Sequence, residues 1–554
     1  MKIVVVGGVA GGMSAAARLR RLQENAEIVV LEAGPEVSFA NCGLPYYVSG
    51  EITDRGALLV QTPESLKASL NLDIRVNSTV TALDPDAKTV QVAGPEGNYE
   101  LSYDELVLSP GADAFRPAIP GIDSARVTTL RTVSDAHTLD EMAKAAKTAV
   151  VIGAGFIGLE AAEALNMRGI KTTVVEFADH VLPPLDQESA YYVTAELDRL
   201  GIDVRTSTSV TAIEEGEGTG ITILSDGSRI AADAVVLSAG VRPRTATWEA
   251  AGVECVDGAI IIDEHGRTSV NHIWAVGDAV TSTDLVTGTK RPVPLAGPAN
   301  RAGRLVADAI SGDLSHPIPA TIGTAVVRVG KLTAAMTGAN ERALAVAGIK
   351  HHTISLHPAN HAGYFPGATQ LHMRMHFGVD GKVLGAQVVG EDGADKRIDV
   401  LATAIKAGMN VADLIDLDLA YAPPYGSAKD PVNMAGMMAA NVLDHTMDIW
   451  HSKDLEKLRE DHLILDVRSR GEYTREGHIK GALNIPHLEI RERMNEIREA
   501  AAGRPIAVHC RSGMRSYLAH RQLVQAGFEC ANHSGGMITM LAELGEGAAG
   551  VIVK

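Results

Sequence analysis

The chain of 554 residues contains few cysteines, few aromatic residues and no long uninterrupted apolar run. Its four cysteines, at positions 42, 255, 510 and 530, are too few and too scattered for a disulfide framework. No two of them have the C-x-x-C spacing of a metal site, so we expect no metal. No run of about 18 apolar residues occurs, and the apolar start is too short for a signal peptide. We therefore expect a cytoplasmic chain without a membrane partner, whose functional thiols stay free.

A basic stripe is also missing. The 50 basic and 68 acidic residues leave a net charge of −18, so we expect no nucleic-acid partner. Hydrophobic residues make up 46% of the chain, which is enough for several cores and excludes a disordered or fibrous protein. With 55 glycines and 4% aromatic residues, the composition favours α/β domains. At about 150 residues per domain, the length predicts three to four of them.

Two glycine-rich turns, each between a predicted strand and a predicted helix, indicate two dinucleotide sites. The predicted units are strand Lys2–Val6, turn Gly7–Gly12, helix Ala15–Leu22 and strand Glu27–Glu32, then strand Thr148–Ile152, turn Gly153–Gly158, helix Leu159–Met167 and strand Thr172–Glu176. Glycines allow the tight turn and the approach of a pyrophosphate, which then lies at the helix N-terminus. The first turn departs from the G-x-G-x-x-G pattern because Val9 replaces its middle glycine.

An acidic residue ends the second strand of each unit. Glu32 and Glu176 stand where a carboxylate accepts hydrogen bonds from ribose hydroxyls, and Glu176 would repel a 2′-phosphate. No lysine or arginine occurs between positions 177 and 182, so NADH is favoured at the second site, with NADPH as the alternative. Together with the segment Val276-Gly277-Asp278, the two units predict FAD at the first site. The candidate cofactor-binding residues are Gly7, Gly8, Ala10, Gly12, Glu32, Gly153, Gly155, Gly158, Glu176, Gly277 and Asp278.

Residues 38–46, Ser-Phe-Ala-Asn-Cys-Gly-Leu-Pro-Tyr, place Cys42 after the first of these units. With residues 294–301 (Pro-Leu-Ala-Gly-Pro-Ala-Asn-Arg) and 421–425 (Tyr-Ala-Pro-Pro-Tyr), this segment resembles the pyridine nucleotide-disulfide oxidoreductases, and more narrowly their coenzyme A-disulfide reductase branch. The resemblance extends from residue 1 to about residue 445. Family members with two cysteines carry C-x4-C. Tyr47 occupies the second position here, so Cys42 needs an external thiol partner.

The resemblance implies a mixed disulfide between Cys42 and coenzyme A, which is cleaved by electrons from a reduced flavin. The adjacent flavin should also lower the pKa of Cys42. The lysine that two-cysteine members place after their cysteines is missing before Lys67. The implied coenzyme A contacts are Ser14, Arg18, Arg21, Ser38, Asn41, Asn300 and Lys429.

The resemblance also implies a homodimer built on residues 322–448. In such a dimer, Tyr364 and Tyr421 reach the active site of the partner subunit as acids or hydrogen-bond donors. Tyr425 is the alternative to Tyr421 in this role.

Three segments near the C-terminus resemble the rhodanese fold: residues 465–468, 477–486 and 509–516. Cys510 follows a predicted strand and opens a predicted helix, where backbone N–H groups form an anion cradle and lower a thiol pKa. Arg511 and Arg515 add positive charge, so Cys510 is predicted to carry a persulfide. The alternative is a phosphatase with C-x5-R, but Arg515 makes the spacing C-x4-R.

The other polar and sulfur residues of interest receive simpler interpretations. His478 is predicted to be structural. Cys255 and Cys530 lack an anion cradle and are predicted to be inert, with a resolving thiol as the alternative for Cys530.

We therefore predict an α/β protein with two Rossmann-like nucleotide-binding domains, an α+β dimerisation domain and a C-terminal α/β rhodanese domain. The predicted bounds are 1–112 and 242–320 for the FAD domain, 113–241 for the NAD(P)H domain, 321–448 for the dimerisation domain and 453–554 for the rhodanese domain. The charged segment His451–Glu460 is predicted as a linker that runs into a helix.

The predicted function is FAD-dependent, NADH-driven reduction of coenzyme A persulfide, polysulfide or coenzyme A disulfide, with Cys42 as the reactive thiol. The fused rhodanese domain favours a persulfide, because a plain disulfide reductase has no use for a carrier of sulfane sulfur. Two alternatives stay open. One is an NADH oxidase that reduces oxygen, and the other is a module that delivers the Cys510 persulfide sulfur to a biosynthetic acceptor protein.

Overall fold

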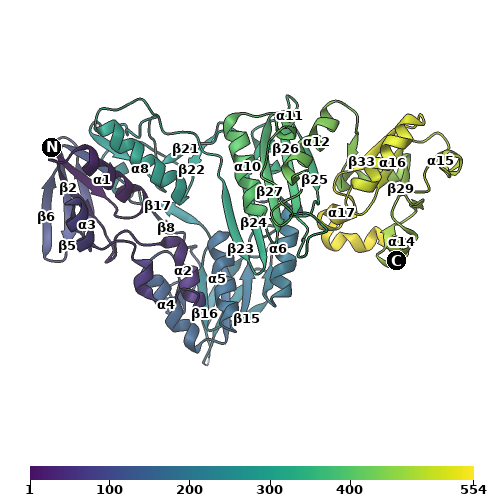
Figure 1. Ribbon diagram of the computed structural model, residues 1–554. Helices are drawn as coiled ribbons and strands as arrows, with labels where there is room; N and C mark the ends of the chain where they lie inside the picture. The colour runs from purple at the N-terminus through teal and green to yellow at the C-terminus, as the bar shows by residue number, and fades with distance from the viewer. Residues whose placement is uncertain (217) are drawn as a thin grey trace. The chain divides into compact units, whose positions relative to one another are not determined.

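The apolar run at the N-terminus forms the central strand of a five-stranded parallel sheet in the computed structural model, which describes residues 1–216 and 218–554 (Figure 1). The strand order is β20-β7-β1-β2-β3. The bounds are β1 Lys2–Val6, β2 Glu27–Leu31, β3 Asp73–Arg75, β7 Glu105–Leu108 and β20 Ile273–Ala275. Strand β20 comes from far along the chain and pairs with β7. The segment that leads into Gly277 and Asp278 therefore completes the first sheet.

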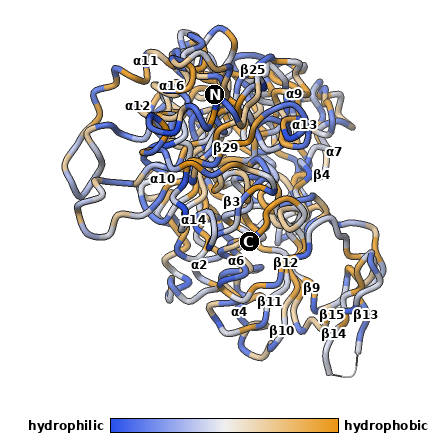
Figure 2. The backbone as a smooth tube through the Cα atoms, turned by 90° about the vertical axis from the view of Figure 1, so that its right-hand side faces the viewer, coloured by the Kyte–Doolittle hydropathy of each residue, from blue (hydrophilic) through white to orange (hydrophobic). Residues whose placement is uncertain are grey.

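A second parallel sheet has the order β12-β11-β10-β16-β9. Its strands are β9 Val127–Thr128, β10 Thr148–Ile152, β11 Lys171–Val175, β12 Asp203–Arg205 and β16 Ala234–Leu237. The central strands are apolar and almost entirely buried, as expected for parallel strands that helices cover on both faces. Figure 2 shows β9 to β12 grouped together, beside the antiparallel strands β13 (Val210–Glu215), β14 (Gly220–Leu224) and β15 (Arg229–Ala232).

A helix begins within each glycine-rich segment. Helix α1 spans Ala10–Leu22 and α5 spans Phe156–Met167, so both begin before the predicted starts at Ala15 and Leu159. The apolar periodicity marks only where a helix touches the core, whereas the backbone is already helical at the last glycines of each segment. Helix α1 packs tightly on α8 (Ala296–Ile310), because a Cβ at Gly303 would lie 2.3 Å from Gly11 O.

These elements belong to a unit formed by Met1–Ala178 and Leu200–Gly323, which we call unit 1. Its other helices are α2 Leu44–Ser49, α3 Pro63–Leu70, α4 Val133–Ala145 and α7 Ala246–Ala250. Its shorter strands are β4 Thr79–Asp84, β5 Thr89–Gly94, β6 Gly97–Ser102, β8 Ala112–Ala114, β17 Val241–Pro243, β18 Cys255–Val256, β19 Ala259–Ile260, β21 Thr281–Thr283 and β22 Lys290–Pro292.

The remaining residues, Asp179–Arg199 and Thr324–Lys554, form unit 2. An antiparallel sheet of order β23-β24-β27-β26-β25 lies in it, with β25 at one edge. The strands are β23 Ala325–Val329, β24 Leu332–Gly338, β25 His351–Leu356, β26 His372–Gly378 and β27 Val383–Gly390. The helices are α9 Glu341–Val346, α10 Ala394–Ala407, α11 Val411–Ile415 and α12 Pro431–Leu443.

Helix α6 (Gln187–Arg199) packs against this antiparallel sheet. The predicted NAD(P)H domain, 113–241, spans this helix. Its buried face, with Ala190, Val193 and Leu197, contacts strands that lie much later in the chain.

The C-terminal part of unit 2 has its own parallel sheet, of order β28-β33-β32-β29-β31. Its strands are β28 Ile449–Trp450, β29 Leu463–Asp466, β31 Leu483–Asn484, β32 Ile506–His509 and β33 Cys530–His533, and a separate pair joins β30 His478–Ile479 to β34 Ile552–Val553. The helices are α13 Leu455–Asp461, α14 Arg470–Arg475, α15 Met494–Ala501, α16 Met514–Gln525 and α17 Gly536–Leu544.

The segment predicted as a linker is folded into this C-terminal module. Strand β28 pairs with β33, and a 3-10 turn (Ser452–Asp454) leads into α13. The predicted start at residue 453 therefore leaves out a strand of the sheet. Among residues 1–216 and 218–554, none of the helices combines the length and the apolar character that a membrane span requires.

Candidate functional site

The two glycine turns have the same backbone geometry. Gly7 adopts φ +97° and Gly153 adopts φ +102°, a region that side-chain-bearing residues rarely occupy. A Cβ would lie 2.0 Å from Ser109 O in the first case and 2.5 Å from Ser238 O in the second, so both positions require glycine. Val9, which interrupts the first pattern, has φ −116° and therefore needs no glycine.

The last glycine of each turn allows the helix to approach the turn. A Cβ at Gly12 would lie 1.9 Å from Gly7 O, and one at Gly158 would lie 1.9 Å from Gly153 O. At Gly155, by contrast, a Cβ would meet no atom within 4 Å, so the backbone there faces open space. A pyrophosphate can approach the chain at such a position.

The two predicted carboxylates lie beside the turns in matching arrangements. Glu32 accepts hydrogen bonds from Gly8 N–H at 2.7 Å and from Gly34 N–H at 2.8 Å. Glu176 is buried and accepts hydrogen bonds from Ala154 N–H at 2.6 Å and from the N–H two residues after it at 2.8 Å. Both carboxylates are thus held at the carboxyl edge of a parallel sheet, where nucleotides bind in such folds.

Both sites fit a dinucleotide. In the part of the chain that the structure describes, no side chain caps α1 or α5, and neither helix has an acidic residue in its first turn. Their first N–H groups and the positive end of the helix dipole therefore favour an anion. The turn at 7–12, with Glu32, Gly277 and Asp278, suits FAD, and the turn at 153–158, with Glu176, suits NADH.

Asp278 has a partner that the sequence did not indicate. Its carboxylate lies 3.5 Å from the Arg131 guanidinium, which comes from the turn before α4. Desolvation raises the pKa of Asp278, while Arg131 opposes this shift. The preceding glycine has φ +88°, so the backbone turns sharply at the end of β20.

Cys42 lies in a 3-10 turn, Asn41–Gly43, and is exposed. Desolvation by the surrounding chain and the negative charge of Glu160 raise the pKa of its thiol. The lowering of this pKa that we expect from an adjacent flavin stays a prediction, because the rise described here comes from the chain alone.

The structure brings several of the predicted coenzyme A contacts together between α1 and α8. The Ser14 hydroxyl donates to Asn300 Oδ1 at 2.5 Å. Arg18 pairs with the largely buried Asp308 at 2.6 Å, so part of its charge is already compensated by a residue that the sequence did not indicate. Arg21 is exposed on the same helix.

The other predicted contacts lie in two places. Ser38 has φ +49° and its N–H donates to Gly8 O at 2.8 Å, which ties the segment before Asn41 to the first glycine turn. Lys429 is exposed and belongs to unit 2. The roles of all these residues stay predictions.

The predicted tyrosines lie on the surface of unit 2. Tyr364 and Tyr421 are exposed, and their hydroxyl oxygens are 3.0 Å apart. This hydrogen bond raises the pKa of Tyr364. Tyr425 is exposed too, and together with Tyr421 it lines a cavity of about 430 Å³. The first two tyrosines therefore form a hydrogen-bonded pair, and the third is their neighbour.

Cys510 follows β32 and is fully buried. We call residues 510–513, which connect it to α16, the Cys510 loop. Gly513 has φ +90° at the start of this helix, and the Ser516 hydroxyl donates to Cys510 Sγ at 3.3 Å. The sulfur thus lies at the N-terminal end of α16, where a negative charge is stabilised.

Arg515 does not act as a free cation. Its two terminal nitrogens donate to both carboxylate oxygens of Glu472, at 2.8 and 2.6 Å. This bidentate pair, together with two hydrogen bonds from Ser469, lowers the pKa of Glu472 to about 2. Glu472 in turn raises the pKa of Arg515, to which the Cys510 sulfur also contributes. Arg511 is exposed. Glu472 was not among the predicted site residues, and its S-x-x-E spacing from Ser469 is the pattern of a helix cap.

The remaining thiols and His478 lie in different surroundings. Desolvation raises the pKa of Cys255 and raises that of the buried Cys530 strongly, so neither is disposed to form a thiolate. The His478 ring stacks on Tyr473, with centroids 3.7 Å apart. Within residues 1–216 and 218–554, no group of three or more His, Cys, Asp or Glu side chains is arranged to hold a metal ion.

Three family models match the chain. The pyridine nucleotide-disulphide oxidoreductase model matches residues 1–302, its dimerisation domain matches 324–431, and the rhodanese-like domain matches 451–540. The fold class predicted from the sequence is confirmed by these matches and by the sheets described above.

Relatives and solved structures extend the comparison. Coenzyme A disulfide reductase of Staphylococcus haemolyticus (strain JCSC1435) is 33% identical over 447 residues, which are 80% of this chain and 100% of that protein. The structure of reduced CoADR-RHD from Bacillus anthracis has a TM-score of 0.96 and 43% identity, and the match covers 100% of this chain and 99% of that one. A NAD-dependent persulfide reductase from A. fulgidus has a TM-score of 0.91 and 39% identity, over 97% of this chain and 100% of that one.

Proposed function

Because the chain belongs to the pyridine nucleotide-disulphide oxidoreductase family, we propose that it uses NADH and FAD to reduce coenzyme A persulfides or disulfides at Cys42. We propose further that Cys510, in the fused rhodanese-like domain, carries sulfane sulfur. One observation carries this proposal. Cys42 is an exposed thiol with a tyrosine, Tyr47, at the place of a second cysteine, so its disulfide partner has to be a substrate.

The reductive step begins with attack of the Cys42 thiolate on the sulfur that is bonded to coenzyme A. In a coenzyme A persulfide, a bond forms between Cys42 Sγ and this sulfur, the S–S bond of the persulfide breaks, and hydrosulfide leaves. FAD held at the glycine turn 7–12 would supply the electron pair, which originates in NADH. Two electrons and one proton then split the mixed disulfide into the Cys42 thiolate and the coenzyme A thiol.

The chain's own residues hold the substrate and move the proton. Arg21 is exposed on α1, beside the hydrogen-bonded Ser14 and Asn300, where it can pair with the phosphates of coenzyme A. The hydrogen-bonded hydroxyls of Tyr364 and Tyr421 can donate to the leaving sulfur in the active site of a partner subunit. The match to a dimerisation domain supports the homodimer that this arrangement needs.

The sulfur-transfer step takes place at Cys510. Its thiolate attacks the outer sulfur of a donor such as thiosulfate, a new S–S bond forms on Cys510, the S–S bond of the donor breaks, and sulfite leaves. The N-terminal end of α16 and the Ser516 hydroxyl stabilise the sulfur anion. An acceptor thiolate then removes the outer sulfur.

Mass spectrometry of the purified protein under non-reducing conditions tests this proposal. We expect coenzyme A to be bound to Cys42 as a mixed disulfide, and we expect NADH to release the coenzyme A by reducing this disulfide. In the same preparation, NADH oxidation should be fast with coenzyme A persulfide or disulfide and slow with air. Rapid oxidation by air alone, with no coenzyme A on Cys42, would favour an NADH oxidase and would reject the proposal.

A further inference from the structure

The first turn of helix α17 is hydrogen-bonded to the backbone of the Cys510 loop. The N–H of Met537 donates to Cys510 O at 2.9 Å, and the N–H of Ile538 donates to Arg511 O at 3.0 Å. Gly536, with φ +63°, approaches so closely that a Cβ there would lie 2.6 Å from Cys510 O. Any displacement of the start of α17 is therefore transmitted to the backbone on either side of the Cys510 sulfur.

The same helix and the turn before it dock on the antiparallel sheet of unit 2. Strand β25 lies at the edge of that sheet, so its outer backbone groups need partners from elsewhere. The Ser355 N–H donates to Ser534 Oγ at 2.8 Å, and both residues are buried. Just beyond the strand, His357 Nε2 lies 2.8 Å from Thr539 Oγ1 in α17. The C-terminal module thus supplies a partner for one edge N–H group of β25 and contacts the residue just beyond it.

His357 is held in place from its other side. Its Nδ1 lies 3.0 Å from His372 Nδ1, and the Tyr192 ring stacks on His372 with centroids 3.6 Å apart. Burial keeps both imidazoles neutral near pH 7, since it lowers the pKa of His357 strongly and that of His372 to about 4. A neutral imidazole has one donor and one acceptor nitrogen, and both the Thr539 hydroxyl and the Gly535 backbone are hydrogen-bond partners of His357 on the side of α17.

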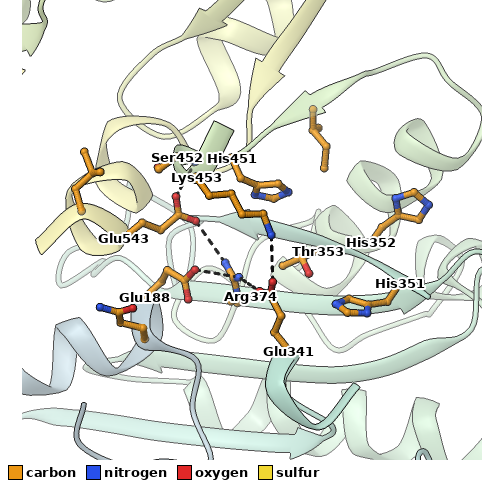
Figure 3. Close-up of a pocket in the computed structure, with 13 residues that line it drawn as sticks. Glu188, Glu341, His351, His352, Thr353, Arg374, His451, Ser452, Lys453 and Glu543 are labelled. Carbon is orange, nitrogen blue, oxygen red and sulfur yellow. Dashed lines mark hydrogen bonds and ion pairs between the residues drawn. The ribbon is translucent and has the colours of Figure 1, made fainter. Parts of the chain in front are cut away.

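A second anchor lies one helical turn further along α17. Glu543 stands four residues after Thr539, on the same face of the helix. Its carboxylate lies 3.7 Å from the buried Arg374 of β26, and it accepts a hydrogen bond from Ser452 N–H at 3.0 Å. Figure 3 shows Glu543, Arg374 and Ser452 beside a cavity. The volume of this cavity is about 500 Å³. Arg374 also pairs with Asp186, Glu188 and Glu341.

We propose that the dimerisation domain positions the Cys510 loop through α17, with Thr539 and His357 as positioning residues for sulfur transfer. The first turn of α17 holds the loop, and two successive turns of the same helix hold the sheet. The rate of sulfur transfer then depends on contacts that lie outside the rhodanese-like domain. This inference rests on the proposed role of Cys510 as the sulfur carrier.

Thr539→Val in the full-length protein tests the inference, because valine keeps the shape of threonine and removes the hydroxyl. His357 then loses one of its buried hydrogen-bond partners, and we expect the start of α17 to shift in response. With thiosulfate as the donor and a small thiol as the acceptor, we expect kcat to fall about tenfold with little change in KM, since small misplacements of reacting groups are costly. Thr539→Ser restores the hydroxyl and should restore kcat. NADH-driven reduction of coenzyme A disulfide should be unchanged in both variants.

Native sulfur transfer by Thr539→Val would overturn the inference. The inference would also be overturned if kcat for sulfur transfer fell equally in Thr539→Ser and the melting temperature of that variant were lowered, because this result indicates a general packing defect. If Thr539→Val does not fold, Glu543→Gln is the variant to test, because it weakens the second contact between α17 and the sheet. Glu188→Gln is its control, since it removes a carboxylate near Arg374 without changing α17. Equal rates of sulfur transfer in these two variants would also overturn the inference. No sulfur transfer by the unmodified protein would instead reject the proposed role of Cys510.

Discussion

Replacing Glu472 by glutamine should slow sulfur transfer at Cys510 while leaving NADH-driven reduction at Cys42 unchanged. The Glu472 carboxylate holds the Arg515 guanidinium by two hydrogen bonds, at 2.8 and 2.6 Å. Arg515 in turn interacts with the Cys510 sulfur. An amide keeps the shape of the carboxylate but replaces one acceptor oxygen by a donor NH₂ group, so one of the two bonds to Arg515 is lost.

The magnitude follows from the pKa of Glu472, which falls from an ordinary value of 4.5 to about 2. At about 1.4 kcal/mol for each pH unit, this shift corresponds to about 3 kcal/mol for the contacts with Arg515 and Ser469 together. Water reaches the pair, and the resulting screening reduces its contribution to about 1–2 kcal/mol. If this energy no longer positions Arg515, the rate of sulfur transfer should be about 5- to 30-fold lower.

The pH dependence has a definite sign. The folded-state pKa of Glu472 is depressed, so the pair contributes its full stability above about pH 4.5 and loses it as the pH falls towards 2. Urea unfolding of the native protein and of Glu472→Gln should therefore differ by a constant amount from pH 6 to pH 9, and the difference should shrink below about pH 4.5.

The assay is thiosulfate-to-thiol sulfur transfer by the full-length protein at pH 7. Glu476→Gln is the matched control, since Glu476 lies on the same short segment and contacts Arg468 at 3.8 Å rather than Arg515. We expect the control to keep the native rate. A native rate in Glu472→Gln, or the same loss in both variants, would refute the reasoning.

Three further substitutions test the two thiols and the nucleotide site. Cys42→Ser should keep FAD and NADH binding but lose the reduction of coenzyme A disulfide and persulfide, which an NADH oxidation assay measures. Full turnover by this variant would contradict the proposed mechanism. Cys510→Ser should lose thiosulfate sulfur transfer and keep NADH-driven reduction of a small free persulfide, and equal loss of both would make Cys510 an obligatory relay. Glu176→Ala should narrow the preference for NADH over NADPH in the ratio of their kcat/KM values, because it removes a negative charge beside the ribose site. A native protein that already prefers NADPH would contradict this reasoning.

The motifs that are short and local were predictable from the sequence. A glycine turn between a strand and a helix occupies consecutive residues, and its conformation follows from steric limits that act within the turn itself. Gly7 and Gly153 have the positive φ that this pattern requires. Cys42 and Cys510 were recognisable for the same reason, because the residues on either side of each cysteine form its motif.

Partners that lie far away along the chain were not predictable. Arg515 and Glu472 are 43 positions apart, and Arg18 and Asp308 are 290 positions apart. Both pairs change the electrostatics of a predicted site, since each supplies a carboxylate to an arginine that the sequence analysis treated as free positive charge. Burial is the main cause of the raised pKa of Cys42, and Glu160, from a helix of the other nucleotide-binding segment, adds to it.

The sequence by itself determined the four kinds of domain, the two nucleotide turns and the two thiols, because turn geometry and strand hydrophobicity depend on near neighbours. Only the tertiary structure decided which charges meet those thiols, that α6 joins the antiparallel sheet, and that α17 connects the Cys510 loop to β25. The physical reason is that contacts between distant side chains depend on how sheets and helices pack. The apolar pattern of a helix tells which face is buried, but not which of several apolar surfaces will cover it.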